Sequence, residues 1–290
     1  MLYDIFIAPF GGDFTFMRRA LVACLALALG YGPVGTFLVI RRMALVSDAM
    51  AHAVLPGAAI GFLVSGLSLW AMGIGGLVAG LIVAVLAGLV SRLTTLREDA
   101  SFAALYLISL ALGVTIIALR GSSVDLIHVL FGSILAVDDA ALYLMAGTAT
   151  LTLAAILLML RPLVLETLDP KFLAALGGGG AAWHIGFLAL VAVNTVAGFQ
   201  ALGTLMAVGL MVLPAVAARF WSREILPLMG LSSALALLSG YLGLLASFHF
   251  DLPSGPAIVL MAAAIYLASM AIGRHDSLRA RLMQPAHLRN

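Results

Sequence analysis

The chain has 290 residues, of which 63% are hydrophobic and 10% charged, and its mean hydropathy is +1.17. Soluble proteins are about 45–50% apolar and about one-quarter charged, so this chain has too little charge to cover a water-facing surface. The composition excludes a cytosolic enzyme, a disordered chain and a nucleic-acid binder, which would need a basic patch. The single cysteine, Cys24, excludes a disulfide framework and a thiolate metal cluster. We therefore expect an integral membrane protein.

Nine apolar runs predict membrane-spanning helices, each of which needs about 20 residues to cross the hydrocarbon core. They cover approximately residues 20–40, 45–67, 70–91, 101–119, 140–160, 182–199, 201–218, 226–247 and 256–273. The number falls to eight if one of the weaker runs does not cross. The linkers are short, so we expect an all-α polytopic bundle of about eight or nine spans, forming one membrane-embedded domain over residues 1–290.

The ends and loops of the chain predict its orientation. Residues 1–17 form no signal peptide, because Asp4, Pro9 and a Gly-Gly-Asp run interrupt any apolar core, and we expect them at the membrane surface. Most of the arginines, and the only lysine, fall on one side of the predicted spans. The positive-inside rule assigns this side, with the loop 161–181 and the tail 274–290, to the cytoplasm. With nine spans, the N-terminus lies outside.

The segment 45–67 carries ionisable side chains, which are rare and usually functional inside a membrane. Asp48 and His52 are four residues apart and would lie on one face of a helix, about one turn from each other. A carboxylate oxygen and an imidazole nitrogen at this spacing can bind one divalent ion. Pro56 would bend the helix and leave carbonyl groups free to line a path. Two other interpretations stay open: a hydrogen-bonded Asp–His pair that joins two helices, or an aspartate in the first turn of a helix.

The remaining histidines give weaker signals. His128 belongs to the segment 124–137, which is apolar but too short to cross, and which we interpret as re-entrant or interfacial; there a capping role competes with metal contact. His249, beside Asp251 in an outward loop, is a candidate contact for an arriving ion. His184 is expected to lie at the membrane interface, and Asn194 to form a hydrogen bond between helices.

The loop 161–181 is the longest one on the predicted cytoplasmic side. Glu166, Asp169 and Pro170 are expected to begin a short helix that ends at the glycine run 177–180. Such a helix would suit a partner protein, although an ordinary amphipathic linker would have the same composition. The only lysine, Lys171, has no glycine-rich loop before it, so the chain has no P-loop for ATP. The spans also lack the acidic or basic relay of a proton-coupled carrier, so the energy for transport is expected to come from elsewhere.

Five stretches resemble the permeases of the zinc, manganese and iron ABC importers, in family order. The first runs from GTFLVIRRMAL into SDAMAHAVLPG, over residues 35–57. The others are LFGSIL at 130–135, DPKFLAALG at 169–177, ALGTLMAVGLMVLPA at 201–215 and DLPSGP at 251–256. The resemblance covers most of the chain. It departs at Ser47, which is often glycine in the family, and at Ala51, where the family favours serine.

The resemblance implies partners and roles for particular residues. It implies a homodimer in the bacterial plasma (inner) membrane, a cytoplasmic ABC ATPase dimer docked through residues 161–180, and an extracytoplasmic binding protein that delivers the ion. The metal ligands of the family carry over to Asp48 and His52. The expected contacts with the ATPase are Glu166, Asp169, Pro170, Lys171, Phe172 and Gly177.

The predicted substrate is a divalent transition metal ion, carried as cargo rather than held as a permanent cofactor. Two Asp and two His from paired subunits would suit zinc or manganese, and raw affinity favours zinc, with manganese next. The chain is expected to be a transporter subunit and not an enzyme. The alternative function is a stand-alone secondary metal carrier. An intramembrane metalloprotease is excluded, because the sequence has no H-E-x-x-H motif.

Overall fold

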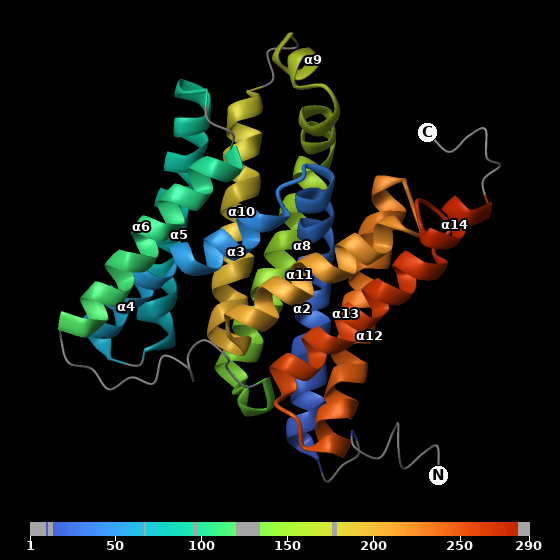
Figure 1. Ribbon diagram of the computed structural model, residues 1–290. Helices are drawn as coiled ribbons and strands as arrows, with labels where there is room; N and C mark the ends of the chain where they lie inside the picture. The colour runs from blue at the N-terminus through green and yellow to red at the C-terminus, as the bar shows by residue number, and fades with distance from the viewer. Residues whose placement is uncertain are drawn as a thin grey trace.

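The computed structural model describes residues 10, 14–66, 68–95, 98–119, 134–175 and 179–283. Within these residues the regular structure is helical, without strands, as the composition predicts (Figure 1). The helices are α2 (Thr15–Ile40), α3 (Ala44–Ala53), α4 (Leu55–Ser65), α5 (Leu69–Leu93), α6 (Glu98–Leu119), the 3-10 turn η2 (Ile134–Ala136), α8 (Asp139–Leu168), α9 (Pro170–Ala175), α10 (Gly180–Leu202), α11 (Thr204–Arg219), α12 (Ile225–Phe250), α13 (Ser254–Ile272) and α14 (Leu278–Met283).

Eight segments of the described chain are long and apolar enough to cross a membrane, with α3 and α4 together forming one of them. The remaining predicted span, residues 201–218, corresponds to α11, whose 16 residues extend about 24 Å along the helix axis. Chain direction alternates between these segments, so the arginine-bearing ends of α8, α11 and α13 lie together at the upper end of the bundle in Figure 1. This end is the one that the positive-inside rule assigns to the cytoplasm.

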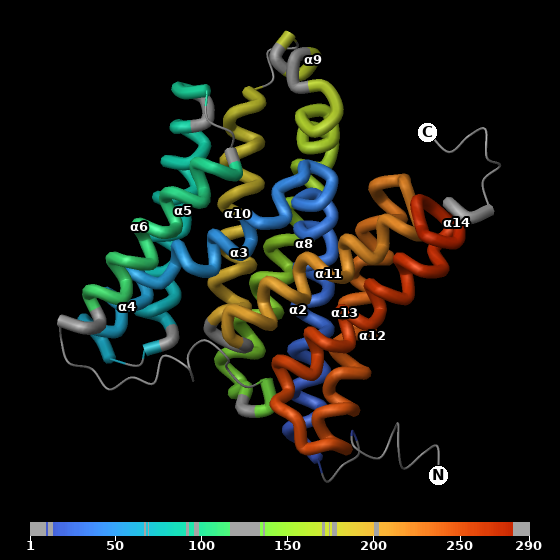
Figure 2. Tube along the Cα trace, in the orientation of Figure 1, coloured from blue at the N-terminus to red at the C-terminus, as the bar shows by residue number. Residues whose placement is uncertain are grey.

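Helix α2 is the central element of the bundle (Figure 2). It packs against α8, α11 and α12 and buries large side chains such as Tyr31 and Phe37. The packing is close because glycine faces the neighbouring backbones: a Cβ on Gly32 would lie 2.8 Å from the Cα of Ser233, and one on Gly35 would lie 3.1 Å from the carbonyl carbon of Met211. Small residues at such crossings let transmembrane helices approach each other.

A second group of helices, α3 to α6, lies beside this centre and is connected to it by α10 (Figure 1). Helices α3 and α4 are separated at Val54, two residues before Pro56, so the predicted bend is confirmed. The carbonyl group of Ala53 at this break does not stay free, because it accepts a hydrogen bond of 2.9 Å from the Ser109 hydroxyl of α6. This hydrogen bond therefore connects the end of α3 to α6.

The first helix begins earlier than the predicted span. Helix α2 starts at Thr15, so residues 15–17 are its first turn, and Met17 is buried. Arg19, in the first turns of α2, pairs with Asp139 at the start of α8 at 3.1 Å. Long arginine side chains can reach solvent from within such a helix, so their charge does not delay its start.

The prediction for residues 161–181 is also wrong in its first half. Helix α8 continues through Pro162 to Leu168, so Glu166 lies in the last turns of a long helix and does not begin a short one. The continuation is stabilised by the packing of Leu163, which is fully buried, and by Arg41, which donates a hydrogen bond to the Leu163 carbonyl oxygen. The short helix itself exists as α9, and the predicted glycine end at Gly177 falls outside the described residues.

Candidate functional site

Helix α3 places Asp48 and His52 on the same face, as their spacing predicts. Asp48 Oδ1 lies 3.9 Å from His52 Nε2, which is too long for a hydrogen bond. Both residues belong to one helix, so the alternative of a hydrogen-bonded pair that joins two helices is wrong. Asp48 lies in the second turn of α3 and caps nothing, so the first-turn alternative is wrong as well. The two groups are therefore free to share a third partner.

A pocket of about 360 Å³ opens beside this pair. Its other walls come from Thr204, Leu205, Val208 and Gly209 of α11 and from Val259 of α13. The Asp48 side chain is 55% exposed and that of His52 is 27% exposed. Their donor atoms thus face an accessible space with mostly apolar walls, a setting in which an ion would bind chiefly to these two side chains.

The His52 ring is held from its other side. It stacks on Tyr106 of α6, with ring centroids 5.9 Å apart and planes 29° from parallel. His52 Nδ1 is buried and has no hydrogen-bond partner within the described part of the chain. A buried nitrogen without a partner is uncommon, and metal-binding histidines usually donate a hydrogen bond from the nitrogen that does not bind the ion. The ring position is therefore fixed by packing and not by a hydrogen bond.

Within the described residues, Asp48 and His52 have no further candidate metal ligand beside them. Among the described residues no group of three or more His, Cys, Asp or Glu side chains is close enough to hold an ion together. Transition metals in proteins commonly bind four or more ligands, and Asp48 and His52 are two. An ion bound by Asp48 and His52 would therefore need further ligands from beyond the described residues.

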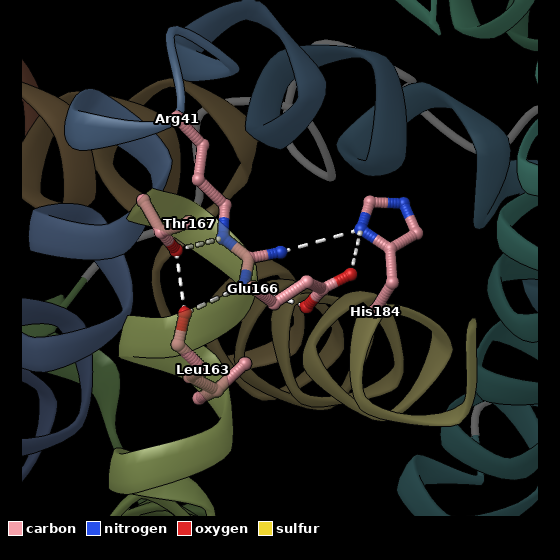
Figure 3. Close-up of polar contacts among 5 residues, drawn as sticks. All are labelled: Arg41, Leu163, Glu166, Thr167 and His184. Carbon is pink, nitrogen blue, oxygen red and sulfur yellow. Dashed lines mark hydrogen bonds and ion pairs between the residues drawn. The ribbon is translucent and has the colours of Figure 1, made fainter. Parts of the chain in front are cut away.

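A buried polar cluster lies at the predicted cytoplasmic end, around Arg41 (Figure 3). The Arg41 guanidinium pairs with Glu166 Oε2 at 2.9 Å and donates a hydrogen bond to Thr167 Oγ1 at 3.0 Å. The guanidinium also lies 3.2 Å from Nδ1 of His184 and stacks over the Phe187 ring. His184 Nδ1 is itself 3.7 Å from Glu166 Oε1. The side chains of Arg41, Glu166 and His184 are 7%, 11% and 11% exposed.

This cluster, which we call the Arg41 cluster (Arg41, Glu166, Thr167 and His184), changes two predictions. Glu166 faces the interior, so the predicted direct contact with an ATPase does not match its burial. His184 is buried between α2 and α8 and does not reach out to the interface as expected. The sequence did not indicate that Glu166 and His184 are buried together. The hydropathy pattern shows where a span ends, but not which charged side chain of another span lies beside that end.

The other predicted contacts with a partner lie on or before α9. Asp169 accepts a hydrogen bond of 2.9 Å from the backbone N–H of Phe172 and so caps α9, while the Phe172 side chain is 49% exposed. Pro170 and Lys171 form the first turn of α9. An exposed phenylalanine on a short surface helix is a suitable contact for another protein.

The predicted outward contacts are separate from the metal-binding pair. His249 is exposed at the end of α12, where its Nδ1 lies 2.9 Å from the Leu245 carbonyl oxygen of the same helix. Asp251 ends that helix in a left-handed conformation, with φ of 50°. Neither residue lines the pocket of Asp48 and His52, and His128 falls outside the described residues. Asn194 does join two helices as predicted, since its amide donates to Thr152 Oγ1 at 2.8 Å.

The fold and this pocket define the membrane-spanning subunit of a transporter. The chain belongs to the ABC 3 transport family, whose family model matches residues 13–273. It is 34% identical to the manganese import system permease protein ScaB of Streptococcus parasanguinis, over 90% of this chain and 91% of that protein. It is 28% identical to the chelated iron transport system membrane protein YfeD of Yersinia pestis, over 98% and 94% of the two chains.

A solved structure, PsaBC from Streptococcus pneumoniae in complex with Fab, has a similar fold. It matches with a TM-score of 0.82 and 30% sequence identity, over 95% of this chain and 98% of that chain. The chain is therefore a permease of a metal ABC importer, a multi-pass protein of the bacterial plasma membrane, and ATP hydrolysis belongs to a separate subunit.

Proposed function

We propose that this permease imports manganese, and that two copies of the chain bind the ion between their Asp48 and His52 side chains. The observation that carries the proposal is the half-site: a carboxylate and an imidazole 3.9 Å apart at an open pocket, with no further metal-binding side chain beside them among the described residues. A second copy would supply the missing Asp and His and complete a site of four side chains.

Manganese is preferred to zinc because of the relatives of this chain. The carboxylate suits manganese, whereas the imidazole and raw affinity favour zinc, so the ligand types by themselves do not select manganese. The relative with 34% identity is named for manganese, and the one with 28% identity is named for iron. The zinc preference expected from affinity alone gains no support from these relatives.

The proposed docking surface for the ATPase is α9, with Asp169, Pro170, Lys171 and Phe172, and Gly177 beyond it. Its support is the exposure of Phe172 and the position of α9 at the arginine-bearing end (Figure 1). An extracytoplasmic binding protein would deliver the ion at the opposite end, where His249 and Asp251 are exposed. The stand-alone carrier loses its support, because the family assigns ATP hydrolysis to a separate subunit.

ATP-driven uptake of manganese, zinc and iron by the permease–ATPase complex in vesicles, with loaded binding protein, tests this function. We expect uptake of manganese by the wild type and its loss, by at least about 10-fold, in Asp48→Ala and in His52→Ala, because each change removes two of four ligands from a dimer. Asp139→Asn is the matched control, since Asp139 is an exposed aspartate at the start of α8.

Two outcomes would contradict the proposal in different ways. Unchanged uptake in a correctly assembled Asp48→Ala complex would remove the site assignment. Uptake of zinc or iron in preference to manganese, lost in the same variants, would keep the site and overturn the metal.

A further inference from the structure

A long groove runs between α8 and α12, and α2 forms its floor. It consists of two cavities, of about 1270 and 470 Å³, which share Leu226 of α12. Both α8 and α12 pack against α2, and each cavity is lined by residues of all three helices. The metal-ion pocket is elsewhere, on α3, α11 and α13. The groove therefore has no part in the site described above.

The length of the groove matches one leaflet of a membrane. Along α12 it extends from Ile225 to Leu237, which is about 18 Å at 1.5 Å per residue. Half of the hydrocarbon core is about 15 Å thick. The inner part is lined by side chains such as Leu25, Leu29 and Leu153, which belong to membrane-spanning helices. A soluble protein does not reach this depth, whereas an acyl chain does.

The end of the groove on the predicted cytoplasmic side is basic. Arg161, Arg219 and Arg223 line it together with two acidic residues, Glu224 and Asp276. Arg223 pairs with Asp276 at 3.2 Å, and both side chains are largely exposed. The side chains of Arg161 and Arg219 make no hydrogen bond or ion pair within the part of the chain that the structure describes. Two guanidinium groups without partners thus face one acid, Glu224, which leaves the end of the groove with a net positive charge.

We propose that this groove binds an anionic phospholipid of the inner leaflet. Its phosphate would lie between Arg161 and Arg219, whose guanidinium groups can bind phosphate oxygens in pairs. One acyl chain would lie along α2 between α8 and α12. Basic pockets between transmembrane helices on the cytoplasmic side are suited to anionic headgroups. The lipid would contact Leu165 and Leu168, and so support the end of α8 that leads into α9.

The test counts bound lipid on the purified full-length permease. Native mass spectrometry after exchange into mixed phosphatidylglycerol and phosphatidylcholine micelles should show one phosphatidylglycerol retained per chain. Arg161→Gln with Arg219→Gln should lower this preference by about 30-fold, since each arginine near the membrane surface contributes severalfold to anionic lipid binding. Arg18→Gln with Arg19→Gln is the matched control, because these arginines are exposed at the opposite end of the bundle.

A second variant tests the acyl-chain part without touching the arginines. Gly230 lines the inner cavity, and a Cβ on it would have no atom within 4 Å. Gly230→Phe should therefore fit into the groove without disturbing the helices. Retention of phosphatidylglycerol should fall in this variant as well. A ligand held by its phosphate alone would be unaffected, and inorganic phosphate would compete for it.

Three results would overturn the proposal. Equal retention of the two lipids by the wild type would show that the basic end does not select an anionic headgroup. Full retention in the Arg161→Gln/Arg219→Gln variant would do the same. Release of phosphatidylglycerol when the ATPase subunit binds would assign the groove to the protein partner.

Discussion

At the scale of single residues, the Arg41 guanidinium joins the end of α2 to the end of α8. Arg41 directly follows α2 and lies three residues before α3, the helix that carries Asp48 and His52. Its partner Glu166 lies three residues before Asp169, which caps α9. A shift of α9 caused by a docked ATPase would move Glu166, and the buried ion pair would resist separation because an unpaired buried charge is costly. We expect the Arg41 cluster to couple α9, the proposed docking helix, to α3, the helix of the proposed metal ligands.

Arg41→Ala is therefore expected to destabilise the protein by about 3–5 kcal/mol, because it leaves Glu166 buried without its main partner. Transport per ATP hydrolysed should fall more than metal binding does. Thermal unfolding and the ratio of uptake to hydrolysis measure the two effects. Arg42→Ala is the control, since Arg42 is exposed beside it.

A double variant separates the two explanations for such a loss. Glu166→Gln in the Arg41→Ala background removes the unpaired charge and should recover part of the stability. Coupling should stay impaired, because the Arg41 side chain no longer joins the end of α2 to α8. Recovery of normal coupling together with stability would show that Arg41 acts only on folding.

At the scale of elements, α9 is short and depends on its neighbours for its position. It has six residues, so its own helical hydrogen bonds cannot hold it together in water. The Asp169 cap and the long α8 that precedes it fix where α9 begins. A helix positioned in this way can transmit a push from a bound protein into α8.

Phe172→Asp is expected to abolish copurification of the ATPase, because an exposed aromatic side chain at a contact surface often contributes more than about 2 kcal/mol to binding. The folded permease should remain, since Phe172 is half-exposed. Leu278→Asp is the control, an equally exposed apolar residue of α14 on the same end of the bundle (Figure 1). Equal loss in both variants would indicate a general effect on the surface and not docking through α9.

At the scale of the whole molecule, the proposed half-site would make the function of one chain depend on a second copy. Asp48 and His52 line a pocket whose other walls come from α11 and α13. These walls carry apolar side chains and one hydroxyl group, that of Thr204. Manganese held by two ligands from each of two copies would be released when the copies move apart. Transport would then follow from relative motion of the subunits, which the ATPase can drive.

A tandem fusion of two permease copies tests this dependence. With Asp48→Ala and His52→Ala in one copy only, we expect almost no uptake, because two ligands remain where four are needed. Equilibrium binding should give one manganese ion per wild-type tandem. Half of the normal uptake in the mixed tandem would contradict the shared site, since each copy would then bind an ion alone.

The sequence alone determined the membrane fold, the nine apolar runs that became the eight long segments and α11, and the position of Asp48 and His52 on one helical face. These features follow from hydropathy and helical spacing, which depend on residues close together in the chain. Only the tertiary structure decided that Arg41, Glu166 and His184 form one buried cluster, that α11 and α13 line the pocket of Asp48 and His52, and that α8 and α12 leave a groove over α2. Burial of a given polar side chain depends on which distant helix packs against it, and no local pattern carries that information.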